Sequence, residues 1–532
     1  MNKLLLGLAT IFLFACSKNS NNSQPPTPPA QLKVDKSSLK LNGNKTSVDS
    51  FNIQYSGSWK ISFNPSTISW LKATPSSGSG NTLIHVTAEE DNATGADRIA
   101  TIIVTPDGDA TKAVNVGVTQ HPSNTLWSKL YGGSGNDFFT NVTQTSDGGY
   151  LAIGTAASTD GDVSANKNSR DVWVVKVDAN GNKVWEKSYG GTNSEDGASI
   201  AKTSDGNFVI AAYSSSTDGD ITVNKGRSDL FVFKIDGNGS ILWKKTYGGS
   251  LGEYTSGNTF MAATSDGGTV IAASSDSNDG DVSGNHGIED FWIIKLDQSG
   301  TIVWNKTFGG THLDEAHGIT ASTDGGFLVI GYTASDEGDV SGNHTPGTWD
   351  VWALKIDADG NKLWQKPFGG TLNDNGFAIT NTNDNGFILA GYITSTDGDV
   401  SNNHGMSDAW IVKIDSSGNK LWTKTYGGSA NDGASSIIRV TNGFLVAGQT
   451  ESTDGDVIPT NGIVGAWIFQ IDDNGAIVWQ KNFGGSKGGG GITIIPTSDG
   501  KFVVTGSTSS NDGDVSGNHG QIDAWIFKIS GN

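Results

Sequence analysis

A tryptophan followed five residues later by a Gly-Gly pair recurs seven times, and this repeat limits the fold more than any other feature of the chain. The tryptophans are Trp127, Trp185, Trp243, Trp304, Trp364, Trp422 and Trp479, separated by 58, 58, 61, 60, 58 and 57 residues. A period of this length is typical of repeat architectures, in which each unit buries its apolar face against its neighbours. We therefore expect residues 124–532 to form one array of similar units.

Each unit carries the sequence signals of four short β-strands. Asp-Gly pairs such as Asp147-Gly148 and Asp324-Gly325 separate apolar runs, and they tolerate the positive φ angles of tight hairpin turns. No stretch of useful length shows helical periodicity. Seven units of four strands predict an all-β fold, a seven-bladed β-propeller, which is within the usual range of blade numbers. The repeat is similar to those of kelch-like and other Gly-rich bacterial propellers.

The two ends of the array predict how the ring closes. The last unit stops after the run Asp523–Ser530 and lacks a fourth strand, whereas the array opens with an unmatched fourth strand at Leu126–Tyr131. We expect the N-terminal strand of the array to complete the last blade, because closure removes the sheet edges that invite aggregation.

Residues 31–122 show short alternating runs between clusters of Gly, Pro, Asn and Ser, which predicts an Ig-like β-sandwich. This segment resembles the BACON domain, a β-sandwich found at the front of secreted bacterial glycan-degrading proteins, through Gly57-Ser58-Trp59, Trp70-Leu71, Thr74–Gly78 and Val116–Gln120. The resemblance implies carbohydrate binding, although members also serve as spacers. Trp59 and Trp70 are therefore candidates for stacking on sugar rings, with packing in the core as the alternative.

The N-terminal segment has the pattern of an exported and tethered protein. Residues 1–15 join one lysine to an apolar run too short to span about 30 Å of hydrocarbon, which predicts a signal peptide. Leu13-Phe14-Ala15-Cys16 resembles a bacterial lipobox, which implies cleavage before Cys16 and its lipidation. Residues 16–30 continue as a Ser/Asn/Pro linker that cannot pack. We expect a lipid anchor in the bacterial cell envelope, at the outer membrane; surface-exposed and periplasmic orientations both stay open.

Composition excludes two further classes of protein. The formal net charge of −20 argues against nucleic-acid binding, because neutralising phosphates needs clustered lysines and arginines. The single cysteine cannot form a disulfide within the chain. The expected partners are a polysaccharide or a cell-envelope protein, and the membrane is contacted through the lipid anchor only.

An Asp-Gly-Asp element recurs in a long loop of every unit, with Glu337 in place of the first aspartate in one copy. Aspartates at alternate positions are suitable oxygen ligands for Ca²⁺. The alternative is that they form Asx turns, in which each carboxylate accepts hydrogen bonds from nearby backbone N–H groups. Calcium is the one cofactor that the sequence suggests, and its candidate ligands are Asp160, Asp162, Asp279, Asp281, Asp397, Asp399, Asp512 and Asp514.

A second carboxylate precedes an apolar run in six units, and a lysine follows it five residues on, as in Asp171 and Lys176. Both are missing from the sixth unit, where Gly465 and Gln470 stand instead, which suggests that these two sets of side chains form charge pairs. One further loop position holds a histidine in four units, which either binds metal or hydrogen-bonds its own loop: His286, His344, His404 and His519.

Catalysis has little support, because the chain has no nucleophile elbow, zinc-binding helix or phosphate loop, and nearly all of its acids are repeated. The candidate ligand-binding residues of the array are the ones that depart from the repeat: His312, Glu315, His317 and Trp349. We expect a non-catalytic binding or scaffold module, with a polysaccharide as its partner. The alternatives are a protein-binding adhesin and a glycan hydrolase or lyase that uses Glu253, Tyr254, His312 and Glu315.

Overall fold

The computed structural model describes residues 31–531, apart from residues 42, 44, 46, 91, 93–96, 121–124, 165, 168–169, 255–259 and 459–463. The chain divides into two compact units, Met1–Ser123 and Asn124–Asn532. The expected signal peptide (1–15), the lipidated Cys16 and the linker (16–30) lie outside the described residues. No helix within the described part of the chain is long and apolar enough to cross a membrane.

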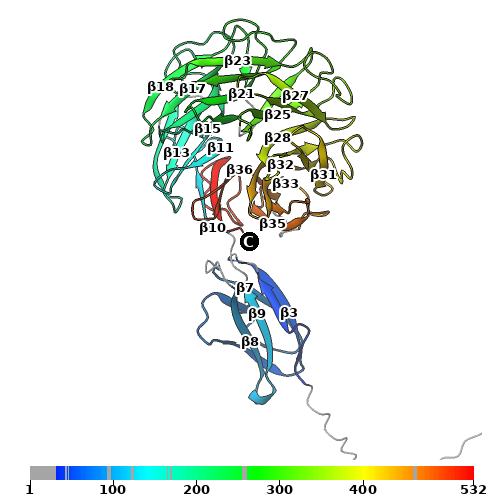
Figure 1. Ribbon diagram of the computed structural model, residues 1–532. Helices are drawn as coiled ribbons and strands as arrows, with labels where there is room; N and C mark the ends of the chain where they lie inside the picture. The colour runs from blue at the N-terminus through cyan, green and yellow to red at the C-terminus, as the bar shows by residue number, and fades with distance from the viewer. Residues whose placement is uncertain are drawn as a thin grey trace, which may run out of the picture. The chain divides into compact units, whose positions relative to one another are not determined.

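The N-terminal unit consists of two β-sheets around one core (Figure 1). One sheet has the order β1 (Lys33–Val34), β3 (Val48–Gln54), β7 (Thr82–Ala88), β5 (Leu71–Thr74). The other has the order β2 (Ser38–Leu41), β9 (Val114–Gln120), β8 (Arg98–Pro106), β4 (Ser58–Asn64), β6 (Ser77–Ser79), and the 3-10 turn η1 (Ala110–Lys112) joins β8 to β9. Burial alternates along the strands, as it does when one face of each sheet covers a core.

The two candidate tryptophans of this unit differ in exposure. Trp59 is 1% exposed in the core, and its Nε1–H donates to the carbonyl of Gly80 at 3.1 Å. Trp70 is partly buried and packs against the same core. Core packing therefore accounts for Trp59, whereas Trp70 keeps part of its ring at the surface.

Within the described residues, the C-terminal unit consists of seven antiparallel sheets. The first three are β11 (Asp137–Gln144), β12 (Tyr150–Ala156), β13 (Asp171–Val177), β14 (Lys183–Tyr189); β15 (Glu195–Lys202), β16 (Phe208–Ser214), β17 (Asp229–Ile235), β18 (Ile241–Tyr247); and β19 (Glu253–Tyr254) with β20 (Met261–Ala263), β21 (Thr269–Ser275), β22 (Asp290–Leu296), β23 (Ile302–Phe308).

The remaining four sheets follow the same order along the chain. They are β24 (Asp314–Ala321), β25 (Phe327–Thr333), β26 (Asp350–Ile356), β27 (Lys362–Phe368); β28 (Asp374–Asn381), β29 (Phe387–Ile393), β30 (Asp408–Ile414), β31 (Lys420–Tyr426); β32 (Asp432–Val440), β33 (Gly443–Thr450), β34 (Val464–Ile471), β35 (Ile477–Gly485); and β36 (Gly489–Pro496), β37 (Phe502–Thr508), β38 (Asp523–Ile529), β10 (Thr125–Tyr131). The predictions of an all-β chain and of repeated four-stranded antiparallel units are confirmed.

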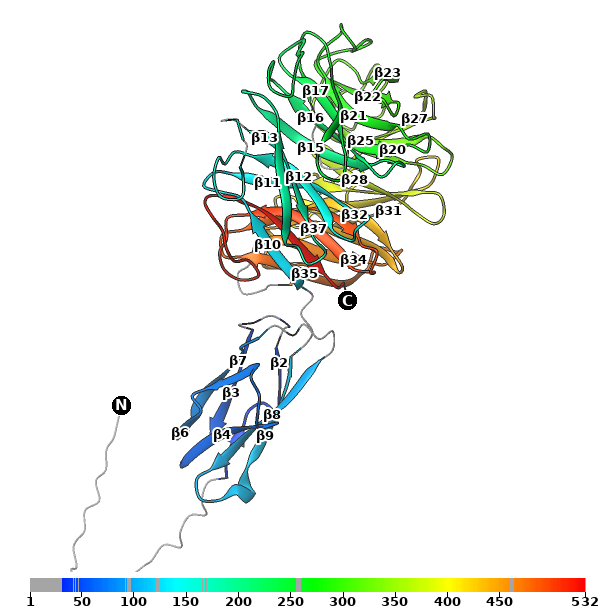
Figure 2. The ribbon, with the colours of Figure 1, turned by 90° about the vertical axis from the view of Figure 1, so that its left-hand side faces the viewer.

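The sheets follow one another around a ring (Figure 1). The first strand of each sheet packs against the first strands of its two neighbours, with β20 making these contacts in the third sheet, and β11 packs against β36 and β37 of the last sheet. That last sheet takes its outer strand from the start of the unit, because β10 pairs antiparallel with β38, with Leu130 opposite Trp525. The cyan β10 lies beside the red C-terminal strands in both ribbon views (Figure 2).

Four of the repeated tryptophans hydrogen-bond from one sheet to the next. The Nε1–H of Trp127 donates to the carbonyl of Ala179 at 3.1 Å, in the turn between β13 and β14. A Cβ at Gly181 of this turn would lie 2.7 Å from the Trp127 ring, and φ there is 79°, so both the close approach and the backbone require glycine. The corresponding bonds to the next sheet come from Trp243, Trp304 and Trp364.

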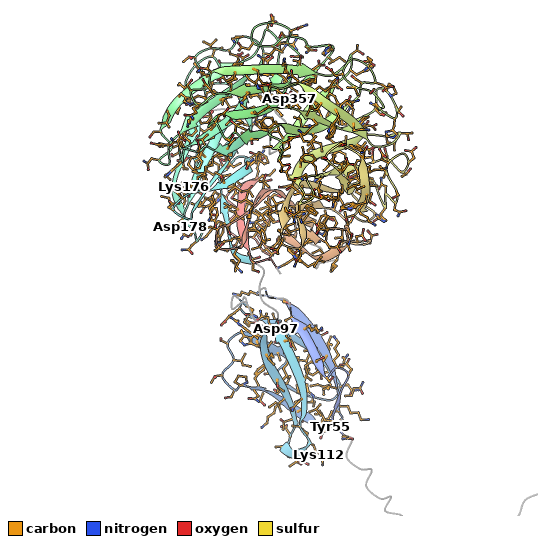
Figure 3. The ribbon with its side chains drawn as sticks, viewed as in Figure 1. Tyr55, Asp97, Lys112, Lys176, Asp178 and Asp357 are labelled. Carbon is orange, nitrogen blue, oxygen red and sulfur yellow. The ribbon has the colours of Figure 1, made fainter. Side chains whose placement is uncertain are left out.

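The repeated lysines pair differently from the sequence expectation, which is wrong on this point. Lys176, labelled in Figure 3, places its Nζ 2.9 Å from Oδ1 of Asp147 in the hairpin between β11 and β12. Asp171 begins the same strand at the opposite end of the sheet and does not pair with this lysine. The same hairpin pairing recurs in Lys234–Asp205, Lys295–Asp266, Lys355–Asp324, Lys413–Asp384 and Lys528–Asp499.

The sixth unit explains why the lysine is absent there. Its hairpin reads Thr441-Asn442-Gly443 and lacks an aspartate, and the lysine position holds Gln470. The Nε2 of Gln470 donates to the carbonyl of Asn442 at 3.2 Å. The lysine is therefore lost together with its hairpin partner, because an unpaired buried ammonium is costly.

Candidate functional site

The Asp-Gly-Asp loops hydrogen-bond to the Gly-Gly link that precedes each sheet. The N–H of Ser134, just after the first link, donates to Oδ1 of Asp160 at 2.7 Å, and the N–H of Asp162 donates to the carbonyl of Gly132 at 2.8 Å. Equivalent N–H groups donate to the first carboxylate of the other candidate loops, at Asp279, Asp397 and Asp512.

The second carboxylates of these loops face the first glycine of the same link. Asp162, Asp281, Asp399 and Asp514 accept from the N–H groups of Gly132, Gly248, Gly369 and Gly484 at 3.4, 3.1, 3.4 and 3.3 Å. Among the described residues, no three or more His, Cys, Asp or Glu side chains gather in a geometry that could hold a metal ion. The observed bonds are those of backbone-capping turns, as in the alternative interpretation of the loops.

A pair of buried carboxyl groups lies at six of the junctions between neighbouring sheets. One comes from the third strand of a sheet and the other from the first strand of the next, and both contact the first glycine of the link; a Cβ at Gly309 would lie 2.5 Å from Asp290 Oδ1 and 2.7 Å from Asp314 Oδ2. The pairs are Asp523/Asp137, Asp171/Glu195, Asp229/Glu253, Asp290/Asp314, Asp350/Asp374 and Asp408/Asp432. Burial raises the pKa of Asp314 and that of Asp350 to about 6.

The four repeated histidines hydrogen-bond to carboxyl groups of these junctions. The Nδ1 of each histidine lies 2.7 Å from Oδ2 of the third-strand aspartate: His286 with Asp290, His344 with Asp350, His404 with Asp408 and His519 with Asp523. In the first two sheets Lys167 and Lys225 take this position, and their N–H groups donate to Asp171 and Asp229. The histidines thus hydrogen-bond within their own loops, as one of the two sequence interpretations has it.

One pair of facing residues in each sheet differs in identity from sheet to sheet, at a position next to these junctions. The two residues face each other across the first and second strands, as Glu315 and Tyr332 do. The seven pairs are Phe138/Thr155, Asp196/Tyr213, Tyr254/Ser274, Glu315/Tyr332, Asn375/Tyr392, Gly433/Gln449 and Gly490/Ser507. Since equivalent positions of a ring share one face, unrepeated residues at this level form the candidate binding surface.

The largest group on this surface is an aromatic and acidic cluster around β24 and β25. The rings of Trp349 and Tyr332 stack at 4.6 Å with an interplanar angle of 22°. The Tyr332 hydroxyl donates to Oε2 of Glu315 at 2.6 Å, and Oε1 of Glu315 lies 3.5 Å from Nε2 of His317. The His317 ring is buried, stacks on Phe377 at 5.0 Å, and has its Nδ1 2.9 Å from the carbonyl of Gly376. The cluster is therefore an internally bonded group in which Tyr332 and His317 are buried and Trp349 is partly exposed.

Glu289 adds a second acid to the cluster. Burial, and next the charge of Glu315, raise the pKa of Glu289 to about 8. Burial, and next the charge of Glu315, also raise the pKa of Tyr332. Near neutral pH the site therefore combines a protonated carboxyl at Glu289 with donors and acceptors that suit a polyhydroxylated ligand.

The sequence candidates are brought together only in part. Glu315, His317 and Trp349 belong to the cluster, but His312 lies on the exposed link, where its Nδ1 is 3.6 Å from Oε1 of Glu337. Glu253 is fully buried and accepts from the Ser275 hydroxyl at 2.8 Å, so it belongs to a junction carboxyl pair and does not face solvent as a catalytic acid.

Tyr332, Phe377 and Glu289 were missed by the sequence analysis. The signal for Glu289 was available, since the residue before the third-strand aspartate is Arg170, Ser228, Glu289, Trp349, Ser407 and Ile522 in successive described sheets. A position that varies between sheets, inside an otherwise repeated segment, indicates a residue of the candidate binding surface.

Comparisons with known proteins leave the activity of this chain open. No family model matches the chain. The regulatory protein FlaEY of Caulobacter vibrioides is 27% identical over 211 residues, which cover 37% of this chain and 22% of FlaEY. The chain therefore spans about a fifth of the length of FlaEY, 22% of it.

Two solved structures represent the structural matches. The WD40 domain of Pan2 from Neurospora crassa is 9% identical, with 74% of this chain and 90% of that chain covered and a TM-score of 0.39. YCF48 bound to D1 peptide is also 9% identical, with 76% and 95% covered and a TM-score of 0.40.

Proposed function

We propose that residues 124–532 form a closed, seven-bladed β-propeller of the kelch-like, Gly-rich kind, and that residues 31–122 form an Ig-like sandwich of the BACON kind. The pairing of β10 with β38 and the packing of β11 on β36 support the closed ring. A closed ring has no free sheet edge and presents its loops on a fixed scaffold.

In this proposal the protein is an envelope-anchored lipoprotein, held by the lipidated Cys16, whose propeller is a non-catalytic binding or scaffold module for polysaccharide. The partly exposed Trp349, whose ring stacks on the buried Tyr332, carries the proposal, because a flat aromatic surface covers the apolar face of a sugar ring. The N–H of Trp349 donates to Oδ1 of Asn373 at 3.0 Å, so its loop is positioned before any ligand arrives. Such preorganisation lowers the entropy lost on binding.

The test is a screen of the soluble chain from residue 17 against plant and host polysaccharides, with release of reducing ends measured in the same samples. We expect binding without release, and we expect Trp349→Ala to abolish it. Met406→Ala is the matched control, since Met406 is an exposed apolar residue, 67% accessible, in the corresponding loop of the next sheet. Equal loss in both variants, or no binding to any polysaccharide, would refute this function; a lack of both binding and release would favour the adhesin alternative.

A glycan hydrolase is the second candidate, and the unequal acids Glu289 and Glu315 are the observation that favours it. Glycoside hydrolysis uses one protonated carboxyl as the acid and one ionised carboxylate as the base or nucleophile. The raised pKa of Glu289 supplies the protonated group at neutral pH. Release of reducing ends that disappears in both Glu289→Gln and Glu315→Gln would establish this activity in place of simple binding.

A further inference from the structure

One junction of the ring lacks its carboxyl pair. In each of the first five sheets the last residue of the second strand lies opposite two acids, one from each of the two junctions that flank the sheet, as Thr333 does with Asp314 and Asp350. Between the sheet of β32–β35 and the sheet of β36–β38, the third-strand position is Gly465 and the first-strand position is Gly489. Two buried carboxyl side chains are thus absent at the same place.

A pocket of about 700 Å³ opens there. Gly465 and Gly489 both line it, together with Gln449, Lys487, Gly490 and Ser507. Gly490, Gln449 and Ser507 belong to the unrepeated positions described above, so the pocket lies on the candidate binding surface. Its volume is within the range of about 300–1,000 Å³ that small-molecule sites have.

The hydroxyl groups of this junction are those that hold a carboxylate elsewhere. In the preceding sheet the hydroxyls of Thr450 and Ser452 donate to the Asp432 carboxylate. The corresponding hydroxyls, Thr508 and Ser510, instead donate to the carbonyl of Gly488 at 2.7 and 3.2 Å. A hydroxyl rotates at little cost, so the donor of Thr508, which lines the pocket, is available to a carboxylate supplied by a ligand.

The described lining of the pocket contains one basic and one acidic side chain. The Lys487 ammonium makes no hydrogen bond and no ion pair with the described part of the chain. Glu451 is the acid in the lining, and its Oε2 accepts from Nδ2 of Asn431 at 2.9 Å. Lys487 is therefore the basic residue of the lining, and its charge also acts on the nearby Asp512.

We propose that this pocket binds the carboxylate of an acidic sugar, a uronic acid unit of a polysaccharide. The ligand carboxylate takes the place that chain carboxylates occupy at the other junctions, with Lys487 as its counter-ion and Thr508 and Gln449 as hydrogen-bond partners. This inference rests on the proposed polysaccharide function and assigns that function a substrate class. The pocket and the Trp349 cluster then bind different parts of one glycan chain.

The test is calorimetric titration of the soluble chain with trigalacturonate and with its methyl ester, which has the same sugars without charge. We expect the acid to bind at least about tenfold more tightly than the ester, equivalent to about 1.4 kcal/mol. Lys487→Gln is expected to remove this preference. Gly490→Phe is expected to abolish binding of the acid, because a side chain there enters the pocket; its Cβ would meet only Gln449, at 3.4 Å or more.

Gly237→Phe is the matched control for the blocking variant. Gly237 lies in the exposed turn between β17 and β18, outside the pocket, and a Cβ there would have no atom within 4 Å. Since Phe138 stands at the position of Gly490 in the first sheet, and Gly237 has open space around it, both variants are expected to fold. Equal affinity for acid and ester, or acid binding that survives Gly490→Phe, would overturn the proposal.

The two proposals fail in different ways. Neutral polysaccharide bound through Trp349, with no binding of trigalacturonate, overturns the acidic-sugar pocket and leaves the general function standing. Binding of trigalacturonate that Gly490→Phe abolishes, with no polysaccharide bound in the screen, supports the pocket and overturns the polysaccharide function.

Discussion

Replacing Asp171 by asparagine tests whether the buried carboxyl pairs hold protons. Asp171 is fully buried, its Oδ2 accepts the N–H of Lys167, and its Oδ1 has no hydrogen-bond partner among the described residues. Burial, and next the charge of Glu195, raise the pKa of Asp171 to about 7. Asparagine keeps the size and the acceptor of this side chain and removes its titration.

The size of the effect follows from proton linkage. In the unfolded chain the same carboxyl has a pKa of 3.8, so between that value and about 7 the folded protein holds a proton that the unfolded chain has released. The free energy of unfolding therefore falls as the pH rises through this window. A shift of about three pKa units corresponds to about 4 kcal/mol. Asp171→Asn should gain up to about this amount relative to the wild type between about pH 4 and pH 8.

The assay is urea unfolding of the soluble chain at a series of pH values and constant ionic strength. Asp357→Asn is the control, because Asp357 is a turn carboxylate between β26 and β27 (Figure 3), and its hydrogen bond from the Asn361 side chain lowers its pKa. Its difference from the wild type should stay constant above about pH 5, where this carboxyl is ionised in the folded and the unfolded chain. Parallel stability curves for the wild type and Asp171→Asn would refute the reasoning about protonated junctions.

Three further outcomes follow from the structure. Deleting residues 124–131 removes β10 from β38, and calorimetry should then show loss of the single cooperative transition of the ring; an unchanged melt would contradict closure by this strand. Lys355→Met breaks the 2.8 Å pair with Asp324 and should cost about 1 kcal/mol in urea unfolding, whereas Lys355→Gln, which copies Gln470, should cost less. A calcium chelator should leave the melting temperature unchanged, because the Asp-Gly-Asp carboxylates accept backbone N–H groups; a lower melting temperature would favour calcium ligation instead.

Much of the architecture could be predicted from local signals. The spacing of Trp127 and its copies, together with the Asp-Gly hairpins, predicted repeated four-stranded antiparallel sheets, because hairpin pairing depends on residues close in sequence. The partner of Lys176 was predicted wrongly for the same kind of reason. In the sixth unit the counterparts of Lys176 and Asp171 are both absent, but the hairpin aspartate is absent there too. The sequence therefore allows two acidic partners for the lysine, and only the folded sheet distinguishes them.

The candidate site depended on contacts between sheets. The sequence by itself determined the repeat, the all-β class and the positions that depart from the pattern, since these are properties of order along the chain. The tertiary structure decided that Glu289, Glu315 and Trp349 share one surface, that acids pair across six junctions, and that Gly465 and Gly489 leave a pocket at another. These groups come from different sheets, and their distances are set by how the sheets pack around the ring.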